Sequence, residues 1–431
     1  MNKTVVVSGL MLFSLFFGAG NLIFPPMLGY TAGQHLWIAM LGFVVTGILL
    51  PLLTVIITAY YDEGVEGAGN KVHPVFGLIF AIVIYLSIGA LYGIPRAANV
   101  AYEIGVKSIF PAAGYWLLIV FSLLFFILVY IIALNPSKMA ATLGKVLTPV
   151  LLFVIALLSL FAIMHPERAL QPAHGKYIHA PFVSGLLEGY FTMDLVAALA
   201  FSVVVVNSFK YAGITDKKQI VISIFKAGII SSSLLLLIYL SLAYMGGTSS
   251  AHAFKDGTDI LTYQSLRNFG SLGNLLFAAI VLLACLTTCI GLVNACAEFF
   301  HKIYGKISYQ RWALIFSVMG FCFTTLGLET ILSLAVPLLI FIYPVSIVLV
   351  LLSCVQVIIK GRSKYLFILP AAVTLLFSVL QIIAEQVGWF HGFYNMLPLS
   401  SLGLAWLVPF MIFSFIGFIM DRVIPASRVA A

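Results

Sequence analysis

Long apolar runs alternate with short polar segments along the whole chain. A membrane-spanning helix needs about 20 apolar residues to cross the hydrocarbon core of a bilayer. By that measure the pattern predicts twelve spanning helices, near residues 4–30, 36–60, 74–105, 113–134, 143–164, 184–209, 219–245, 271–300, 310–328, 331–356, 365–386 and 400–420. The expected fold class is therefore an all-α polytopic membrane protein.

The composition supports membrane insertion. Of the 431 residues, 62% are hydrophobic and only 8% are charged, whereas a soluble globular domain carries about 25% charged residues. A soluble fold of this size needs a polar surface, so much of the apolar side-chain area must face lipid. The five cysteines lie inside apolar runs, so no disulfide is expected.

The distribution of basic residues predicts the orientation. The net charge is +8, but the basic residues stand singly between apolar runs, so no nucleic-acid partner is expected. Twelve spans place both termini on one side of the membrane. If that side is the cytoplasm, 16 of the 22 Lys and Arg residues lie at or near it, which is the bias that orients membrane proteins. We expect a multi-pass protein of the cell inner membrane with both termini in the cytoplasm.

The first span carries the clearest functional signal. Gly18, Gly20 and Asn21 fall near the middle of the membrane, and two prolines follow. Glycine weakens a helix and proline removes a backbone donor, so the helix is expected to break here. Broken backbone is tolerated at this depth only where it lines a cavity within the protein. The half-helix beginning near Asn21 would offer N–H groups to a carboxylate, and the one ending near Phe17 would offer carbonyls to a cation. A glycine pair that only packs helices is the alternative.

Polar residues in three further spans are candidates for ligand binding. Asp194 lies inside the sixth span, where an acid is costly in lipid, and it can face an ammonium group, a sodium ion or a proton. Thr287 and Thr288 in the eighth span offer hydroxyl oxygens to a small cation, although such hydroxyls also bond back to the backbone. Arg96 and Glu103 share a face of the third span and predict an interfacial pair or a gate. A snorkelling arginine is the alternative.

The sequence contains no signature of a catalytic or ATP-dependent protein. It lacks a nucleophile elbow, a phosphate-binding loop and a His-Glu zinc motif, so neither an enzyme nor an ATPase subunit is expected. Cys285, Cys289 and Cys296 share a helical face, which we interpret as packing rather than as a metal site. The spans hold too few polar residues for a continuous pore, so a secondary transporter is favoured over a channel.

Together these motifs resemble the bacterial branched-chain amino acid:cation symporter family. The motifs are Gly-Ala-Gly-Asn-Leu-Ile-Phe-Pro-Pro at 18–26, Gly-Ile-Pro-Arg at 93–96 with Tyr-Glu at 102–103, and Gly-Tyr-Phe-Thr-Met-Asp at 189–194. That family belongs to the amino acid–polyamine–cation superfamily. The resemblance therefore implies a five-plus-five inverted-repeat (LeuT-like) core with broken first and sixth helices. We expect one transporter domain, with repeats at 1–165 and 180–356 and two additional helices at 357–431.

The resemblance also implies a substrate, a coupling ion and their binding residues. The substrates would be leucine, isoleucine and valine, the coupling ion would be sodium, and no organic cofactor is expected. The residues expected to bind the substrate are Gly18, Ala19, Gly20, Asn21, Phe191, Thr192, Met193 and Asp194. Those expected to bind sodium are Ser14, Phe17, Thr287 and Thr288.

A further expectation concerns the group that binds the substrate carboxylate. No arginine is expected deep enough to hold the substrate carboxylate, so backbone N–H groups near Gly20 and Asn21 are expected to bind it.

Two alternatives stay open: coupling to protons through Lys145 at the start of the fifth span, and exchange of another neutral amino acid. A buried lysine shifts its pKa readily and can carry a proton, but Lys145 lies only about one turn into its span and can snorkel to the cytoplasmic surface, so sodium is favoured. Besides its substrate, the protein is expected to contact membrane lipid.

Overall fold

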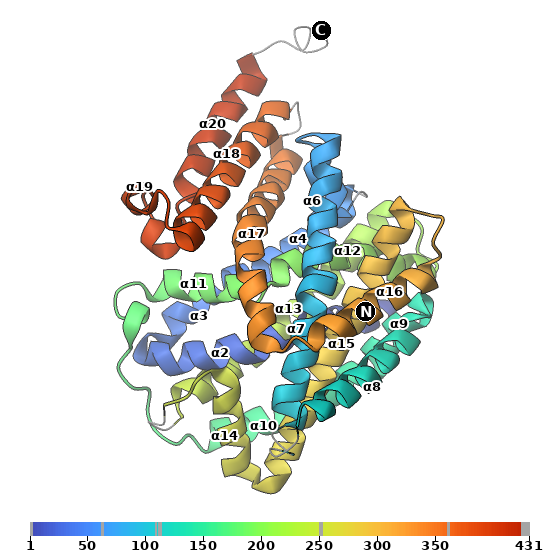
Figure 1. The fold of residues 1–431 in the computed structure, drawn as a ribbon, viewed down its shortest axis with the longest axis vertical. Helices are drawn as coiled ribbons and strands as arrows, with labels where there is room; N and C mark the ends of the chain where they lie inside the picture. Colours follow the sequence, from blue (N-terminus) through green and yellow to red (C-terminus); the bar gives the residue numbers. More distant parts are fainter. Residues whose placement is uncertain are drawn as a thin grey trace. The chain divides into compact units, whose positions relative to one another are not determined.

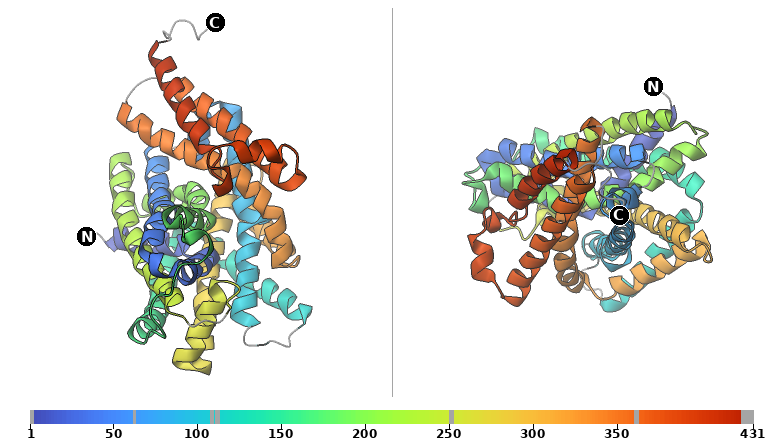
Figure 2. Two further views of the ribbon diagram at one scale, coloured as in Figure 1. Left: turned by 90° about the vertical axis from the view of Figure 1, so that its left-hand side faces the viewer. Right: turned by 90° about the horizontal axis from the view of Figure 1, so that it is seen from above.

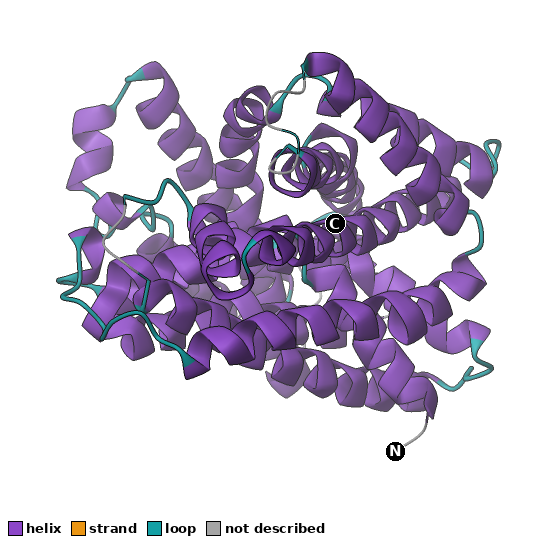
Figure 3. Cartoon of the chain, turned by 90° about the horizontal axis from the view of Figure 1, so that it is seen from below, coloured by secondary structure: helices purple, strands orange, loops and turns teal. Residues whose placement is uncertain are grey.

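The regular structure is helical throughout the part of the chain that the computed structural model describes, with no strand in it (Figure 3). That part comprises residues 3–61, 64–107, 110, 114–249, 253–359 and 363–423. Lys360, Arg362 and Arg428, which the charge bias counts on the cytoplasmic side, lie outside these ranges.

The α-helices follow one another with short connections. They are α1 (Lys3–Phe16), α2 (Ala19–Ala32), α3 (Leu36–Val44), α4 (Leu50–Tyr61), α5 (Gly64–Asn70), α6 (Pro74–Leu86), α7 (Gly93–Val100), α8 (Tyr115–Ala133), α9 (Pro136–Thr142), α10 (Thr148–Met164), α11 (Pro181–Phe191), α12 (Asp194–Tyr211), α13 (Lys217–Gly247), α14 (Gly257–Phe269), α15 (Ser271–Ile303), α16 (Tyr309–Thr324), α17 (Leu328–Ile359), α18 (Lys364–Ile382), α19 (His391–Met396) and α20 (Leu407–Val423). Short π-helical segments join some of them, at Val45–Leu49, Ser87–Leu91, Ala101–Val106, Leu143–Leu147 and Ile383–Val387. Single 3₁₀ turns occur at Gly33–His35, Gly175–Tyr177 and Ser400–Leu402.

The apolar helices have the lengths that membrane crossing requires. Within the described residues, nine helical stretches are long and apolar enough to span a bilayer. Twelve spans were predicted. The difference of three arises because most of the first two predicted spans form one continuous helical stretch, Ala19–Tyr61, while α16 and α20 have only 16 and 17 residues. The all-helical membrane fold is therefore confirmed, and the number of crossings stays a prediction.

The first predicted span is divided, and the break lies slightly earlier than the sequence suggested. Only Phe17 and Gly18 are non-helical between α1 and α2. Gly18 is extended (φ −119°, ψ −161°), and its N–H donates to Asn21 Oδ1 at 3.1 Å. Because this side chain caps the helix from its first turn, Gly20 and Asn21 are already helical. The two prolines lie inside α2, beyond the break.

The sixth predicted span breaks at Thr192 and Met193, between α11 and α12. Met193 has a left-handed backbone (φ 70°), a conformation that costs a residue other than glycine about 1–3 kcal/mol. The Thr192 hydroxyl donates to Gly189 O at 2.8 Å, and Met193 N–H donates to Tyr190 O at 3.2 Å. These two hydrogen bonds terminate α11, although neither glycine nor proline stands at the break. The new helix then begins with Asp194.

The first of two compact units comprises Met1–Ile56 and Ile88–Ile331 and contains both breaks. The long helix α15 packs against α1, α7, α8, α12 and α16, while α2 packs along α13 and α3 packs along α11 (Figure 1). Glycines permit the last two contacts. A methyl group on Gly29 would lie 1.8 Å from Ala243 O, and one on Gly185 would lie 1.8 Å from Ala39 O. Small residues let membrane helices approach at backbone distance in this way.

The second unit comprises Ile57–Ser87 and Leu332–Ala431. Within it α18 and α20, orange and red in Figure 2, run side by side, and α5 packs on α6. The Asp421 carboxylate of α20 accepts hydrogen bonds from the N–H groups of Tyr365 and Leu366, at 3.0 and 2.8 Å, and so caps the start of α18. All of the site residues predicted from the sequence belong to the first unit.

Candidate functional site

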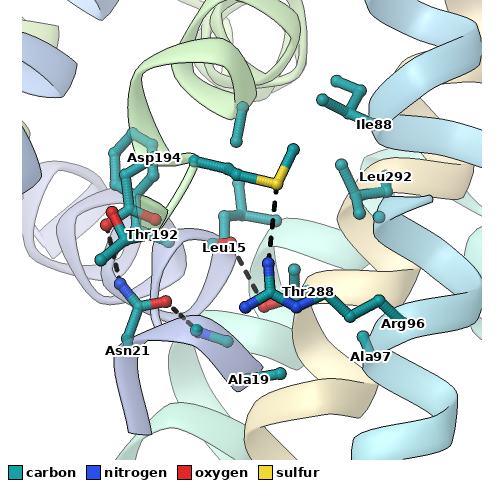
Figure 4. Close-up of a pocket in the computed structure, with 16 residues that line it drawn as sticks. Leu15, Ala19, Asn21, Ile88, Arg96, Ala97, Thr192, Asp194, Thr288 and Leu292 are labelled. Carbon is teal, nitrogen blue, oxygen red and sulfur yellow. Dashed lines mark hydrogen bonds between the residues drawn. The ribbon is translucent and has the colours of Figure 1, made fainter. Parts of the chain in front are cut away.

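A cavity of about 60 Å³ lies where the two helix breaks meet (Figure 4). Its lining residues come from the breaks, from the third span and from α15: Leu15, Phe16, Gly18, Ala19, Gly20, Asn21, Ile88, Gly93, Arg96, Ala97, Thr192, Met193, Asp194, Ala197, Thr288 and Leu292. Mostly apolar walls with a few convergent polar groups are typical of a small-molecule site. The volume suffices for a few water molecules, so the walls must move apart to admit a larger ligand.

A buried hydrogen-bond network holds Asp194 at one side of the cavity. Asn21 Nδ2 donates to Asp194 Oδ2 at 2.7 Å and also contacts the Tyr239 hydroxyl, which in turn donates to Asp194 Oδ2 at 3.3 Å. Asp194 is 4% exposed and Tyr239 is fully buried. As the first residue of α12, Asp194 also lies at the positive end of a helix dipole. The network therefore fixes a carboxylate where it can attract a cation that enters the cavity.

Arg96 enters the same cavity from α7. Its side chain is 7% exposed, and its Nη1 donates to the Tyr92 hydroxyl at 2.8 Å and lies 3.6 Å from Met193 Sδ. A methyl group on Gly20 would lie only 3.2 Å from Arg96 Nη2, which shows that Nη2 lies over the first turn of α2. The expectation that no arginine lies deep enough to meet a substrate carboxylate is therefore wrong.

The predicted pair of Arg96 and Glu103 is also wrong. The Glu103 carboxylate forms an ion pair with Lys107 at 2.7 Å, and both side chains are substantially exposed. Lys107 lies only four residues from Glu103, one helical turn away, whereas Arg96 lies seven residues away. Arg96 stands ten residues before the end of the helical stretch at Val106, which is roughly 15 Å along the axis, too far for its side chain to reach that end.

Thr287 and Thr288 lie against the carboxyl end of α1. The Thr287 hydroxyl is 3.0 Å from both Ser14 O and Ala284 O, and the Thr288 hydroxyl is 3.5 Å from Ser14 O and 3.3 Å from Leu15 O. The Ser14 hydroxyl bonds back to its own helix, so its carbonyl is the group that faces the threonines. This cluster of uncharged oxygens brings together the Ser14, Thr287 and Thr288 predicted for sodium and adds the Leu15 carbonyl.

Two of the sequence-based candidates, Phe191 and Lys145, lie elsewhere. Phe191 is 48% exposed, does not line the cavity, and stacks on Phe24 with 6.2 Å between ring centroids. The Phe17 ring stacks on those of Phe13 and Tyr239, but sodium was expected to bind the Phe17 carbonyl, and that expectation stays a prediction. Lys145 lines a separate cavity of about 240 Å³, together with residues of α1, α9 and the end of α12.

Sequence reasoning did not identify Tyr239 or the apolar walls of the cavity. A tyrosine within an apolar run gives no local signal, and its role emerges only because α13 packs beside α2. No group of three His, Cys, Asp or Glu side chains is arranged to hold a metal ion among the residues that the structure describes. Cys285, Cys289 and Cys296 are buried.

The sequence as a whole is similar to a family of transport proteins. Residues 1–424 match the family described as branched-chain amino acid transport protein. The chain is 41% identical over 433 residues to the branched-chain amino acid permease BraB of Bacillus subtilis (strain 168), covering 99% of this chain and 97% of the relative. It is 40% identical to the branched-chain amino acid permease BrnQ of Corynebacterium glutamicum, covering 97% of this chain and 95% of the relative.

Two solved transporter structures have a similar fold. One is Mhp1, a nucleobase-cation-symport-1 family transporter in a closed conformation with bromovinylhydantoin bound, with a TM-score of 0.55, 10% identity, and coverage of 97% of this chain and 92% of Mhp1. The other is the manganese transporter of Eremococcus coleocola in complex with an aromatic bis-isothiourea substituted compound, with a TM-score of 0.56, 15% identity, and coverage of 97% and 95%. At such low identity the likeness concerns the fold alone, which is LeuT-like.

Proposed function

The chain belongs to the branched-chain amino acid transport protein family, and on that premise we propose that it takes up leucine, isoleucine and valine by sodium-coupled symport. Its curated relatives are named permeases, so the family acts in transport rather than catalysis. The observation that carries the proposal is the cavity where two broken helices meet, with the Thr287–Thr288 oxygen cluster beside it. Our proposal includes a location in the cell inner membrane with both termini in the cytoplasm.

The cavity offers each part of an amino acid a suitable partner. Asp194 attracts the ammonium group, and the first-turn N–H groups of α2 at Ala19 and Gly20 suit the carboxylate. Leu15 and Leu292 are among the apolar walls, which suit a short branched side chain. One methylene in such a pocket is worth about 1–3 kcal/mol, so alanine should compete poorly with leucine.

The oxygen cluster supports sodium as the coupling ion. Hard cations prefer oxygen ligands, and a set of hydroxyls and carbonyls without net charge suits a monovalent ion. The carbonyl end of α1 adds the negative end of a helix dipole. Thr288 also lines the substrate cavity, so an ion held there and a substrate held beside it stabilise the same arrangement of α1, α2 and α15. Shared stabilisation of this kind couples the two binding events.

The arrangement of the breaks fits alternating access by two inverted repeats. The proposed repeats at 1–165 and 180–356 each begin with a divided span, α1–α2 in the first and α11–α12 in the second. The two additional helices at 357–431 would lie outside that core. Transport would then proceed as the broken helices expose the central cavity to one side of the membrane and then to the other.

The choice between sodium and proton coupling can be tested with two variants. Thr288→Ala removes one oxygen of the cluster and should raise the sodium concentration needed for half-maximal leucine uptake, while Lys145→Ala should leave it unchanged. Thr325→Ala is a matched control, because the Thr325 hydroxyl, just after the end of α16, bonds back to Cys322 O. Sodium-independent uptake that follows a pH gradient and becomes uncoupled in Lys145→Ala would replace this mechanism with the proton-coupled one.

A further inference from the structure

We propose that Arg96 binds the substrate carboxylate and thereby restricts transport to ligands with a free carboxylate. The inference rests on the proposed function and adds a residue that determines specificity. It starts from a charge balance: Arg96 is a buried cation, and the burial of a guanidinium group is costly unless an anion or strong acceptors surround it.

The neighbours of Arg96 leave part of its guanidinium group available. Its described hydrogen bonds start from Nη1 and reach neutral acceptors, the Tyr92 hydroxyl at 2.8 Å and Met193 Sδ at 3.6 Å. The Tyr92 and Phe24 rings lie 5.2 and 6.0 Å from its central carbon and hold it by cation–π contacts. Within the described ranges the ion pairs are Lys107–Glu103 and Lys176–Glu188, so no carboxylate of those residues pairs with Arg96. An anion from outside the protein would complete the site.

The free side of Arg96 faces the place where a carboxylate is expected. Nη2 lies within 3.2 Å of where a Gly20 methyl group would stand, so Arg96 and the first-turn N–H groups of α2 border the same space. Figure 4 shows Arg96 entering from one side of the cavity, while Asp194 and Asn21 lie on the other. A zwitterion placed between them can direct its carboxylate to Arg96 and its ammonium group to Asp194.

This placement predicts which ligands are rejected. A guanidinium group can bind both oxygens of a carboxylate. That geometry is lost when the ligand has a neutral amide in place of its carboxylate, or when a lysine ammonium group replaces the arginine. The competing explanation is that Arg96 only balances the charge of Asp194. In that case the loss of Arg96 would weaken the binding of every ammonium-bearing ligand to a similar degree, whether or not the ligand has a carboxylate.

Competition binding separates the two explanations. Purified protein at saturating sodium is titrated with leucine or with leucinamide, which keeps the ammonium group and side chain but lacks the carboxylate, against labelled leucine. Arg96→Gln should raise the leucine dissociation constant roughly 10- to 100-fold and change that of leucinamide less than about twofold. Arg96→Lys should recover part of the leucine affinity, and Arg267→Gln, the same change on the exposed face of α14, should alter neither constant.

A second variant covers the case in which Arg96→Gln does not fold. Tyr92→Phe keeps the guanidinium group but removes the hydroxyl that positions Nη1, so it should weaken leucine selectively and by a smaller factor. Parallel weakening of leucine and leucinamide in Arg96→Gln, or in Tyr92→Phe if the first variant is unstable, would overturn the assignment, as would unchanged leucine affinity. Absence of leucine binding by the wild-type protein would instead contradict the proposed function.

Discussion

Two glycines that stand two residues apart face different parts of the site, and they can be used to separate ion binding from substrate binding. A methyl group on Gly18 would lie 2.9 Å from Thr288 Oγ1 and 3.3 Å from Thr288 Cγ2. A methyl group on Gly20 would lie 3.2 Å from Arg96 Nη2 and 3.3 Å from Thr192 O. Gly18 is extended and Gly20 is helical, so alanine fits the backbone at both positions and the effects should be steric.

The size of the Gly18→Ala effect follows from the contact it creates. A carbon–oxygen approach of 2.9 Å is too close, so the Thr288 hydroxyl must move away from the carbonyls of α1. An interaction of one oxygen with a charged group is worth about 1.5–3 kcal/mol. Its loss should raise the sodium concentration for half-maximal uptake roughly 10- to 150-fold. Gly20→Ala should instead raise the leucine concentration for half-maximal uptake, because its methyl group intrudes on the proposed carboxylate site.

Uptake of labelled leucine by proteoliposomes measures both constants. Sodium is varied at saturating leucine, and leucine at saturating sodium, since each ligand affects the apparent affinity for the other. We expect a crossed result: Gly18→Ala changes the sodium concentration for half-maximal uptake, and Gly20→Ala changes the leucine concentration for half-maximal uptake. An unaltered sodium constant in Gly18→Ala, or the same pattern in both variants, would refute it.

Three further variants test the remaining parts of the site. Asp194→Asn keeps the size of the side chain but removes the charge, so leucine uptake should fall at least roughly 10-fold. Uptake by this variant at the wild-type rate would show that Asp194 has only a structural role. Tyr239→Phe removes one hydrogen-bond donor to Asp194 and should raise the leucine dissociation constant, measured by titration, roughly 3- to 10-fold. A dissociation constant equal to that of the wild type would show that this hydrogen bond has no role in leucine binding. Glu103→Gln should leave uptake within about twofold, because exposed ion pairs contribute about 0–1 kcal/mol. The Glu103 carboxylate accepts a hydrogen bond from Lys107 Nζ and so raises the pKa of Lys107 above its usual value. The stability that the pair adds is therefore present at neutral pH and lost as pH rises through the raised pKa. A thermal-unfolding difference between Glu103→Gln and wild type that grew as pH rose from 7 to 11 would contradict this.

The helices could be predicted because membrane burial imposes a simple pattern. The run at 113–134 became α8 (Tyr115–Ala133), and the run at 271–300 became α15 (Ser271–Ile303), because apolar segments of this length can satisfy their backbone in lipid only as helices. The break at Phe17 and Gly18 was also predictable, since glycine weakens a helix and the two following prolines remove backbone donors. Its register could not be predicted, because it depends on which N–H group Asn21 caps.

The site was only partly predictable because it depends on contacts between distant segments. The break at Met193 has no glycine or proline to mark it, and a left-handed methionine persists only because the surrounding structure holds it. The depth of Arg96 was misjudged because a lone arginine in an apolar span usually extends to the interface, and its Tyr92 and Met193 partners become evident only in three dimensions. Phe191, expected in the pocket by resemblance, lies instead against Phe24. The repeat boundaries and the sodium ligands stay predictions.

Sodium coupling is the central claim of the proposed function, and wild-type protein in proteoliposomes can test it without any substitution. Labelled leucine uptake is followed under an inward sodium gradient, an inward proton gradient, or neither, with potassium replacing sodium where it is omitted. We predict accumulation of leucine above equilibrium under the sodium gradient alone, with isoleucine and valine as competitors and lysine inert. Accumulation that follows the proton gradient and is indifferent to sodium would contradict the account.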